Sequence, residues 1–323
     1  MNRVAIAIDL GGTDIKGALL DREGRLHSPR RVPTGEDRSP AKVVDRLADL
    51  IDGLQKTAGG AAFGVGIGVP GGVYPDSKKI SQAPNFPGWY DVDLVSPLMQ
   101  KTGLPVAIDN DANVAGLGEF EFGAGKAVDS MVLITLGTGI GGGIILDGRI
   151  WRGQWGMAGE IGHITIEPEG VLCGCGNRGC IEAYASGPAL VRQAKEALAR
   201  EPGAPLLQLA GGDPDRITPK LIYDAAKQGC PVSRAVFEKA SRYLGNMMAS
   251  VLNLLNVPLF VIGGGVSASF DLLYEPMRDE IRRRAYRIPG ENVAIQRAIL
   301  GNDAGMIGAG MLAFAELTPA EGR

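Results

Sequence analysis

Short apolar runs alternate along the chain with longer segments in which apolar residues recur every three or four positions. The apolar runs predict strands over residues 3–9, 15–21, 64–69, 105–109, 130–136, 142–147, 259–262 and 292–299. The periodic segments predict helices over residues 39–57, 93–102, 111–120, 184–200, 218–228, 231–255, 270–285 and 304–316. Strands that alternate with helices in this order indicate an α/β architecture.

One stretch of the pattern occurs twice. Residues 8–21, IDLGGTDIKGALLD, align with residues 134–147, ITLGTGIGGGIILD, and six of the 14 positions are identical. Each copy reads as a strand, a glycine turn and a second strand. A chain with 48 glycines can produce such a match by chance. The alternative is a duplicated domain, whose two turns would face each other across a cleft and hold one polyphosphate from both sides.

Composition narrows the class of protein. The chain has 323 residues, 45% hydrophobic and 21% charged, which is ordinary for a globular protein of about two domains. A net charge of −3 carries no electrostatic signature of nucleic acid or an acidic membrane as partner. No apolar run is long enough for a membrane span, and the first residues lack the features of a signal peptide. We therefore expect a cytoplasmic protein, and its few cysteines fit a reducing compartment.

The two glycine turns are candidate phosphate sites. Glycine lets backbone N–H groups approach phosphate oxygens, and a threonine hydroxyl adds a donor in each turn. The turns consist of Gly11, Gly12 and Thr13, and of Gly137, Thr138 and Gly139. Asp9 precedes the first turn and could hold Mg²⁺ through water. The competing interpretation is two hairpin turns without a ligand.

Two familiar nucleotide motifs are excluded. No G-x-x-x-x-G-K-[ST] segment occurs anywhere in the chain, which excludes a Walker A protein. The glycines of residues 137–141 resemble a dinucleotide fingerprint, but a strand-like segment follows them where that fingerprint requires a helix.

The run DNDAN, residues 109–113, stands between a predicted strand and a predicted helix. Asp and Asn are strong helix caps, so capping alone would explain the run. The functional alternative is that one carboxylate is a general base. A kinase that acts on an alcohol needs such a group to accept the hydroxyl proton. Asn110 would then hydrogen-bond the same substrate.

A histidine and three cysteines lie close together in the sequence: His163, Cys173, Cys175 and Cys180. They supply the four ligands of a tetrahedral zinc ion and leave no position open for water, so the metal would be structural. Unbound cytosolic cysteines are the alternative. A zinc-bound histidine normally uses its second ring nitrogen in an outer hydrogen bond, and that partner could be a substrate hydroxyl. Glu160 and Glu182 bracket the cluster.

The turn-rich loop of residues 83–89 contains Asn85, between two proline residues, together with Phe86 and Trp89. Asn85 could contact a sugar. The two aromatic residues could equally anchor the loop on the core.

Taken together, these motifs resemble the ROK family of bacterial sugar kinases, in the group of the glucokinases and N-acetylhexosamine kinases. The resemblance covers essentially the whole chain. It rests on DLGGTDIKG, LGTGIGGG, DNDAN, GEIGH with CGCGNRGCIE, and NLLNVPLFVIGGGVS. It implies the duplicated actin-like fold, related to ribonuclease H, with two domains and an interdomain cleft. We expect a small domain of residues 1–115 with 301–323 and a large domain of residues 116–300, which would include the zinc segment 160–182.

The resemblance also implies roles for particular residues. Asp111 would be the general base on the sugar 6-hydroxyl. The sugar would be bound by Gly71, Gly72, Asn85, Asn110, Asp111, Glu160, His163 and Glu182. ATP would be bound by Asp9, Gly11, Gly12, Thr13, Lys16, Gly137, Thr138, Gly139, Gly264 and Gly265. Zinc would be bound by His163, Cys173, Cys175 and Cys180. The expected cofactors are ATP, Mg²⁺ with ATP and structural Zn²⁺, and the expected assembly is a homodimer or a tetramer.

Within this family the leading hypothesis is a glucokinase. A kinase of N-acetylglucosamine, N-acetylmannosamine, mannose or fructose is the alternative, and the loops around Asn85 and residues 150–158 are candidates for setting that choice. A sugar-sensing transcription regulator is less favoured. Such regulators carry a helix-turn-helix ahead of the kinase-like part, whereas here the first strand begins near residue 3.

Overall fold

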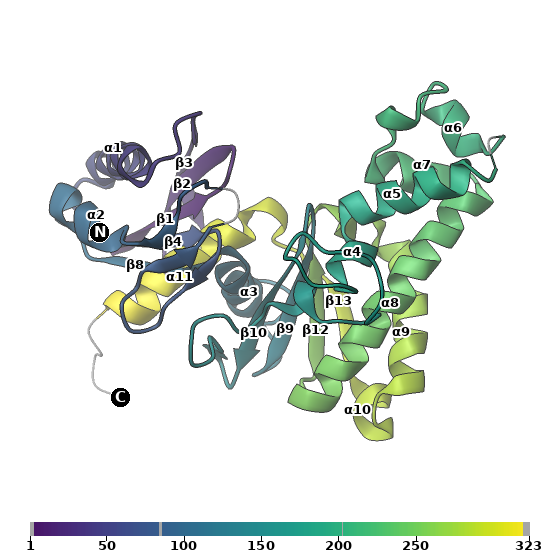
Figure 1. The fold of residues 1–323 in the computed structure, drawn as a ribbon. Coiled ribbons are helices and arrows are strands. Elements are labelled where there is room, and N and C mark those ends of the chain that lie inside the picture. The colour runs from purple at the N-terminus through teal and green to yellow at the C-terminus, as the bar shows by residue number, and fades with distance from the viewer. Residues whose placement is uncertain (1–2, 84–85, 202, 319–323) are drawn as a thin grey trace. The chain divides into compact units, whose positions relative to one another are not determined.

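The computed structural model describes residues 3–83, 86–201 and 203–318 (Figure 1). The chain divides into two compact units. The first comprises Met1–Leu133, Gly143–Gly159 and Ile299–Arg323, and the second comprises Ile134–Gly142 and Glu160–Ala298. The sequence-based expectation began the second domain at residue 116, whereas this division keeps residues 116–133 and 143–159 in the first unit.

A five-stranded sheet forms the centre of the first unit, in the order β3-β2-β1-β4-β8. The strands are β1 (Val4–Leu10), β2 (Asp14–Leu20), β3 (Leu26–Pro33), β4 (Ala62–Val69) and β8 (Val106–Asn110). Strands β1, β4 and β8 run parallel, and β2 and β3 continue the sheet as antiparallel hairpins. The carboxyl ends of three neighbouring strands therefore lie at one edge.

A second five-stranded sheet has the order β11-β10-β9-β12-β13. Its strands are β9 (Met131–Leu136), β10 (Ile140–Leu146), β11 (Arg149–Ile150), β12 (Leu259–Gly263) and β13 (Ala294–Arg297). The order repeats that of the first sheet, strand for strand along the chain. Strands β2 and β10 coincide at the same shift that aligns the two glycine turns. The duplicated α/β fold predicted from the internal repeat is confirmed.

Helices cover both faces of the first sheet. Helices α1 (Pro40–Ala58) and α2 (Val95–Thr102) share one apolar core with the sheet, and α3 (Asp111–Phe122) and α11 (Ala304–Leu317) lie on the opposite side (Figure 1). The buried residues of α1 recur every three or four positions, as an amphipathic helix requires: Val43, Val44, Leu47, Leu50, Ile51 and Leu54.

Glycines allow α3 and α11 to cross at short range. A Cβ on Gly308 would lie 1.6 Å from the carbonyl oxygen of Val114, and a Cβ on Gly118 would lie 2.4 Å from that of Ala304. The two backbones are therefore in direct contact. This packing fixes α3, whose first residue is Asp111.

The second unit is mainly helical. Its helices are α4 (Glu182–Ala185), α5 (Gly187–Leu198), α6 (Pro205–Leu209), α7 (Pro219–Lys227), α8 (Pro231–Leu255), α9 (Phe270–Arg284) and α10 (Arg287–Asn292). Helices α8 and α9 pack side by side (Figure 1). Cys230, the residue before α8, is buried, with 1% of its surface exposed. Among the described helices, none has the length and apolar character needed to cross a membrane.

Several strands of the structure were not predicted from the sequence. Strand β3 is an exposed edge strand that contains Pro29 and Pro33, and it lacks the buried apolar alternation of a central strand. A separate three-stranded sheet joins β5 (Gly72–Val73), β6 (Ile80–Gln82) and β7 (Tyr90–Val92). These strands have two or three residues each, too few to produce a periodic pattern.

Candidate active site

The first unit places three predicted site segments at one edge of its sheet. In the parallel register Asp9 of β1 pairs with Gly68 of β4, which pairs with Asp109 of β8. The residues that follow these strands are the first glycine turn, Gly71 with Gly72, and Asp111. The carboxyl edge of parallel strands is where α/β proteins commonly bind ligands. The sheet topology thus groups residues that are about 100 positions apart in the sequence.

Asn110 and Asp111 form the start of α3. Asn110 is the N-cap, and its Oδ1 accepts hydrogen bonds from the N–H groups of Ala112 (2.9 Å) and Asn113 (3.2 Å). Its Nδ2 donates to the carbonyl oxygen of Gly71 at 3.1 Å. The Oδ1 of Asp111, an exposed residue, accepts from the N–H of Ala112 at 2.8 Å. The capping interpretation is confirmed for Asn110, and Asp111 is the first residue of the helix that it caps.

The first glycine turn is held rigidly. Gly11 donates its N–H to the carbonyl oxygen of Asp14 at 3.0 Å, and a Cβ on Gly11 would lie 2.8 Å from that oxygen. The buried Thr34 donates its hydroxyl to the carbonyl oxygen of Gly11 at 2.7 Å. Beside the turn, the Nζ of Lys16 lies 3.2 Å from Oδ2 of Asp9, its partner across the β1–β2 hairpin. An ammonium group and a carboxylate therefore flank the backbone of this turn.

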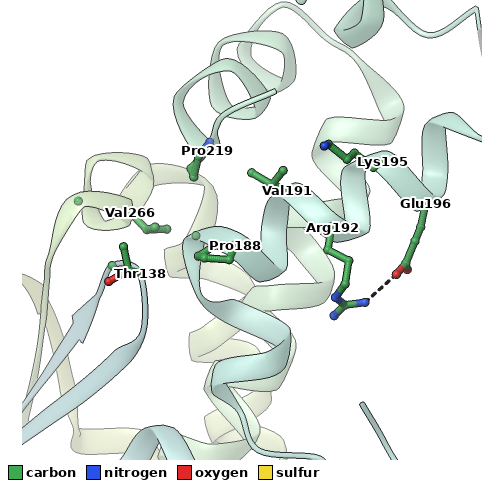
Figure 2. A pocket seen from close by; sticks show the side chains of 11 residues that line it. Thr138, Pro188, Val191, Arg192, Lys195, Glu196, Pro219 and Val266 are labelled. Carbon is green, nitrogen blue, oxygen red and sulfur yellow. Dashed lines mark hydrogen bonds and ion pairs between the residues drawn. The ribbon is translucent and has the colours of Figure 1, made fainter. Parts of the chain in front are cut away.

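The second glycine turn lies in the second unit and lines a cavity of about 760 Å³ (Figure 2). Its wall is built by the turn itself, one face of α5 along most of its length, the start of α7 and the segment after β12. The lining residues are Gly137, Thr138, Gly187, Pro188, Val191, Arg192, Lys195, Glu196, Pro219, Gly265 and Val266. Gly187 donates its N–H to the carbonyl oxygen of Gly137 at 2.8 Å, which joins the turn to the start of α5.

The cavity combines two chemical surfaces. Pro188, Val191, Pro219 and Val266 give it apolar walls, and the first turn of α5 meets the glycine turn at one end (Figure 2). Apolar walls suit a planar heterocycle, and a helix N-terminus beside a glycine turn suits phosphate. Gly264, at φ +78°, brings its segment to the second turn, because a Cβ there would lie 2.4 Å from the carbonyl oxygen of Leu136.

The predicted zinc ligands converge. One donor atom from each of His163, Cys173, Cys175 and Cys180 lies within 4.8 Å of the others. The Sγ atoms of Cys175 and Cys180 are 3.7 Å apart, and Nδ1 of His163 is 3.8 Å from Sγ of Cys173. Ligands about 2.3 Å from one ion in a tetrahedral arrangement lie about 3.8 Å apart. The donor set and its spacing therefore fit zinc.

The electrostatics of the thiols also fit a cation. Burial raises the pKa of Cys173 to about 12, and burial also raises the pKa of Cys180. The backbone N–H of Asn177 lowers the pKa of the exposed Cys175. Three thiolates this close together repel one another, and a divalent cation among them offsets that repulsion and the cost of burial.

The ring of His163 has distinct inner and outer nitrogens. Nδ1 faces the thiols, and Nε2 lies 3.9 Å from Oε2 of Glu160. The side chains of His163 and Glu160 are 37% and 54% exposed, so both are accessible to a ligand. The outer nitrogen is thus available for an outer hydrogen bond, whose partner could be a substrate hydroxyl.

Glu182 makes a contact that the amino-acid sequence did not predict. Its Oε2 accepts a hydrogen bond from the N–H of Ile140 at 2.9 Å, and its Oε1 lies 3.7 Å from Sγ of Cys173. The carboxylate therefore connects the cysteine cluster with the second glycine turn. Its role toward a sugar, like those of Glu160 and His163, stays a prediction.

In the loop of residues 83–89, the structure decides the role of the two aromatic residues. Phe86 and Trp89 are 1% and 0% exposed, their rings lie 4.6 Å apart, and Trp89 donates its Nε1–H to the carbonyl oxygen of Arg38 at 2.7 Å. The aromatic pair anchors the loop on the core. Asn85, predicted to contact the sugar, lies outside the residues that the structure describes.

The repeated sheets, the paired glycine turns and the convergent histidine and cysteines define an actin-like kinase fold with a zinc-type cluster. The chain belongs to the ROK family, whose sequence model matches residues 5–316.

Relatives match along nearly the full length. The glucokinase of Streptomyces coelicolor is 40% identical over 316 residues, 96% of this chain and 97% of that protein. The N-acetylmannosamine kinase of Salmonella arizonae is 31% identical and covers 95% of this chain and 97% of its own. The crystal structure of a ROK family glucokinase from Streptomyces griseus in complex with glucose and AMPPNP has a TM-score of 0.81 at 40% identity, covering 97% of this chain and 99% of that chain.

Proposed function

We propose that the protein is an ATP-dependent glucokinase that transfers the γ-phosphoryl group of ATP to the 6-hydroxyl of glucose. The observation that carries the proposal is the cavity of about 760 Å³ lined by the second glycine turn, α5 and the segment after β12. It suits a nucleoside triphosphate, and it occurs in a chain 40% identical to a glucokinase crystallised with glucose and AMPPNP. We place the adenine between the apolar walls and the phosphates against Gly137, Thr138 and Gly139.

In the proposed reaction Asp111 accepts the proton of the 6-hydroxyl as the oxygen attacks the γ-phosphorus. The bond between the γ-phosphorus and its bridging oxygen breaks, and ADP leaves with the electron pair. Phosphoryl transfer needs positioning and charge stabilisation more than covalent help from the protein. The exposed carboxylate of Asp111, which accepts a hydrogen bond from the N–H of Ala112 at the start of α3, has the chemistry of such a base.

The sugar would be held by Gly71, Gly72, Asn85, Asn110, Glu160, His163 and Glu182. Several carboxylates and amides around one pyranose discriminate well, because a missing hydroxyl leaves buried polar groups unpaired. The triphosphate would also contact Asp9, Gly11, Gly12, Thr13, Lys16, Gly264 and Gly265. Lys16 beside Asp9 offers a cation for a phosphate oxygen, and Asp9 offers a carboxylate for water-bound Mg²⁺.

Zinc would be held by Nδ1 of His163 and the thiolates of Cys173, Cys175 and Cys180. With all four positions filled by protein, the ion supplies structural cross-linking and no Lewis acid chemistry. His163, fixed through Nδ1, presents Nε2 to a sugar hydroxyl beside Glu160. We further propose a cytoplasmic location, which suits reduced zinc ligands, and a homodimer or tetramer.

A second candidate is phosphorylation of N-acetylmannosamine or a related sugar, favoured by the match to a kinase of that name at 31% identity. Release of ADP, coupled to a reporter enzyme, should be measured over a panel of hexoses and N-acetylhexosamines. We expect the highest kcat/KM with glucose. A higher kcat/KM with N-acetylmannosamine would show that the protein is a kinase of that sugar and not a glucokinase. The absence of ADP release with every sugar would refute the proposal that the protein is a sugar kinase.

A further inference from the structure

Asp109 is a charged residue that the proposed reaction does not use. It ends strand β8 two residues before Asp111, and it is 1% exposed. One oxygen, Oδ1, accepts from the backbone N–H of Asn110 at 2.7 Å and from Nδ2 of Asn113 at 2.8 Å. The buried carboxylate therefore binds both the cap residue of α3 and a side chain of its first turn.

The second oxygen of Asp109 meets an arginine from a distant segment. Nε of Arg152, which follows strand β11, lies 2.5 Å from Oδ2 of Asp109. The same guanidinium donates through Nη2 to Oε1 of Glu316 in α11 at 2.7 Å. The other oxygen of Glu316 lies 3.4 Å from Nζ of Lys78, in the turn between β5 and β6. Four alternating charges thus connect the start of α3 with α11 and the small sheet.

The buried carboxylate of Asp109 needs a partner of opposite charge. Within the part of the chain that the structure describes, the ion pair of Asp109 is made by Arg152. A carboxylate buried without a cation is strongly disfavoured, so it moves away from its site or draws in water. Either change weakens its hydrogen bonds to Asn110 and Asn113. Those bonds hold the first turn of α3, on which Asp111 lies.

We propose that Arg152 is a positioning residue for Asp111: its ion pair holds the buried carboxylate of Asp109 in place, and that carboxylate fixes the N-terminal turn of α3. The proposal rests on the proposed function in that Asp111 is taken as the base. Arg152 itself need not touch sugar or nucleotide. Its contribution is the geometry of the carboxylate that accepts the proton.

The geometry requires arginine and not merely a positive charge. Nε of Arg152 contacts Asp109 while Nη2 contacts Glu316, so one planar guanidinium group binds two carboxylates in different directions. A lysine carries one compact charge on a flexible stem and cannot reproduce both contacts at once. Arg152→Lys should therefore retain part of the positioning effect of Arg152, whereas Arg152→Ala should retain none of it.

The test combines kinetics with hydrogen exchange on the full-length protein. Arg152→Ala should lower kcat by at least about 10-fold, because a misplacement of about 1 Å at a catalytic group costs up to about 100-fold. The KM for ATP should change by less than about 2-fold, since the side-chain partners of Arg152, Asp109 and Glu316, are not among the residues that we assign to ATP. Backbone amides of Ala112 and Asn113 should exchange at least about 10-fold faster, since their cap is loosened. Arg149→Ala, an exposed arginine of the same hairpin, is the matched control and should leave all three values unchanged.

A double-mutant cycle separates this role from general support of the fold. In the Asp109→Asn background no buried charge needs a cation, so adding Arg152→Ala should change kcat by less than about 2-fold. An equal loss with and without Asp109→Asn would overturn the proposal, as would unchanged exchange at Ala112 and Asn113 in Arg152→Ala. If Arg152→Ala fails to fold, Arg152→Lys and the double variant give the same comparison. Absence of kinase activity in the unaltered protein would refute the proposed function, while the exchange measurement would still decide the role of Arg152.

Discussion

The carboxylate of Glu182 accepts a hydrogen bond at 2.9 Å from the backbone N–H of Ile140, the residue directly after the second glycine turn. Its other oxygen lies 3.7 Å from Sγ of Cys173 in the cysteine cluster. A Cβ on Gly139 would lie 2.5 Å from the same carboxylate. One side chain therefore connects the metal-type cluster to the turn that we propose binds phosphate.

Removal of this carboxylate should weaken nucleotide binding. Glu182→Ala leaves the N–H of Ile140 without its acceptor, which costs the folded turn about 1–3 kcal/mol of stability. The turn is then free to move. We expect the KM for ATP to rise and kcat/KM to fall by about 10-fold or more. Steady-state kinetics with ATP varied at saturating sugar measure this. Glu169→Ala, an exposed glutamate of the same loop, should behave as the unaltered protein, and equal kinetics for the two variants would contradict the assigned role.

Asp111 should be essential for turnover but not for sugar binding. Asp111→Asn keeps the size of the side chain and removes its ability to accept a proton, so kcat should fall by at least about 100-fold. Sugar affinity, measured by calorimetry, should stay within about one order of magnitude. Asp129→Asn, on the exposed turn before β9, is the control. Near-normal turnover of the Asp111 variant would refute the assignment of Asp111 as the general base.

One zinc ion per chain is expected. Cys175→Ser should lower the zinc content and the melting temperature, because the loop of residues 171–182 then loses its cross-link. A strong chelator should have the same effect on the unaltered protein. Metal analysis and thermal unfolding measure both. Cys230→Ala is the matched control, since this cysteine lies outside the cluster and should leave the zinc content unchanged. If protein purified under reducing conditions is free of metal, the prediction that the cluster binds zinc is refuted.

The glycine crossing of α3 and α11 should control stability. In Gly308→Ala the new methyl group would lie 1.6 Å from the carbonyl oxygen of Val114, so the helices must separate. We expect the free energy of unfolding to fall by about 1–3 kcal/mol or more. Gly116→Ala, on α3 but facing Gly143 of β10 instead of α11, is the control, because its nearest neighbour lies at 3.5 Å and alanine favours the helix. Urea titration distinguishes the two, and equal stabilities would contradict the account.

Local elements were well predicted where the sequence carries a period. The helix expected over residues 231–255 is α8 with the same bounds, and the strand expected over residues 259–262 is β12 with one further residue. The segment expected as one helix over residues 184–200 is broken at Ser186, whose side chain caps α5. Strand β3 and the small sheet were missed, because exposed or very short strands have no core-facing alternation to detect.

The sequence by itself determined what depends on neighbouring residues: the two glycine turns, the cap at Asn110, the repeated strand pair and a histidine and three cysteines within one short loop. Only the tertiary structure decided which distant segments meet. It joined Gly137, Pro188, Pro219 and Val266 into one cavity, and Arg152 with Asp109 and Glu316 into one ionic network. The physical reason is that local geometry follows from backbone preferences over a few residues, whereas long-range pairs follow from how the sheets and helices pack, which no local pattern records.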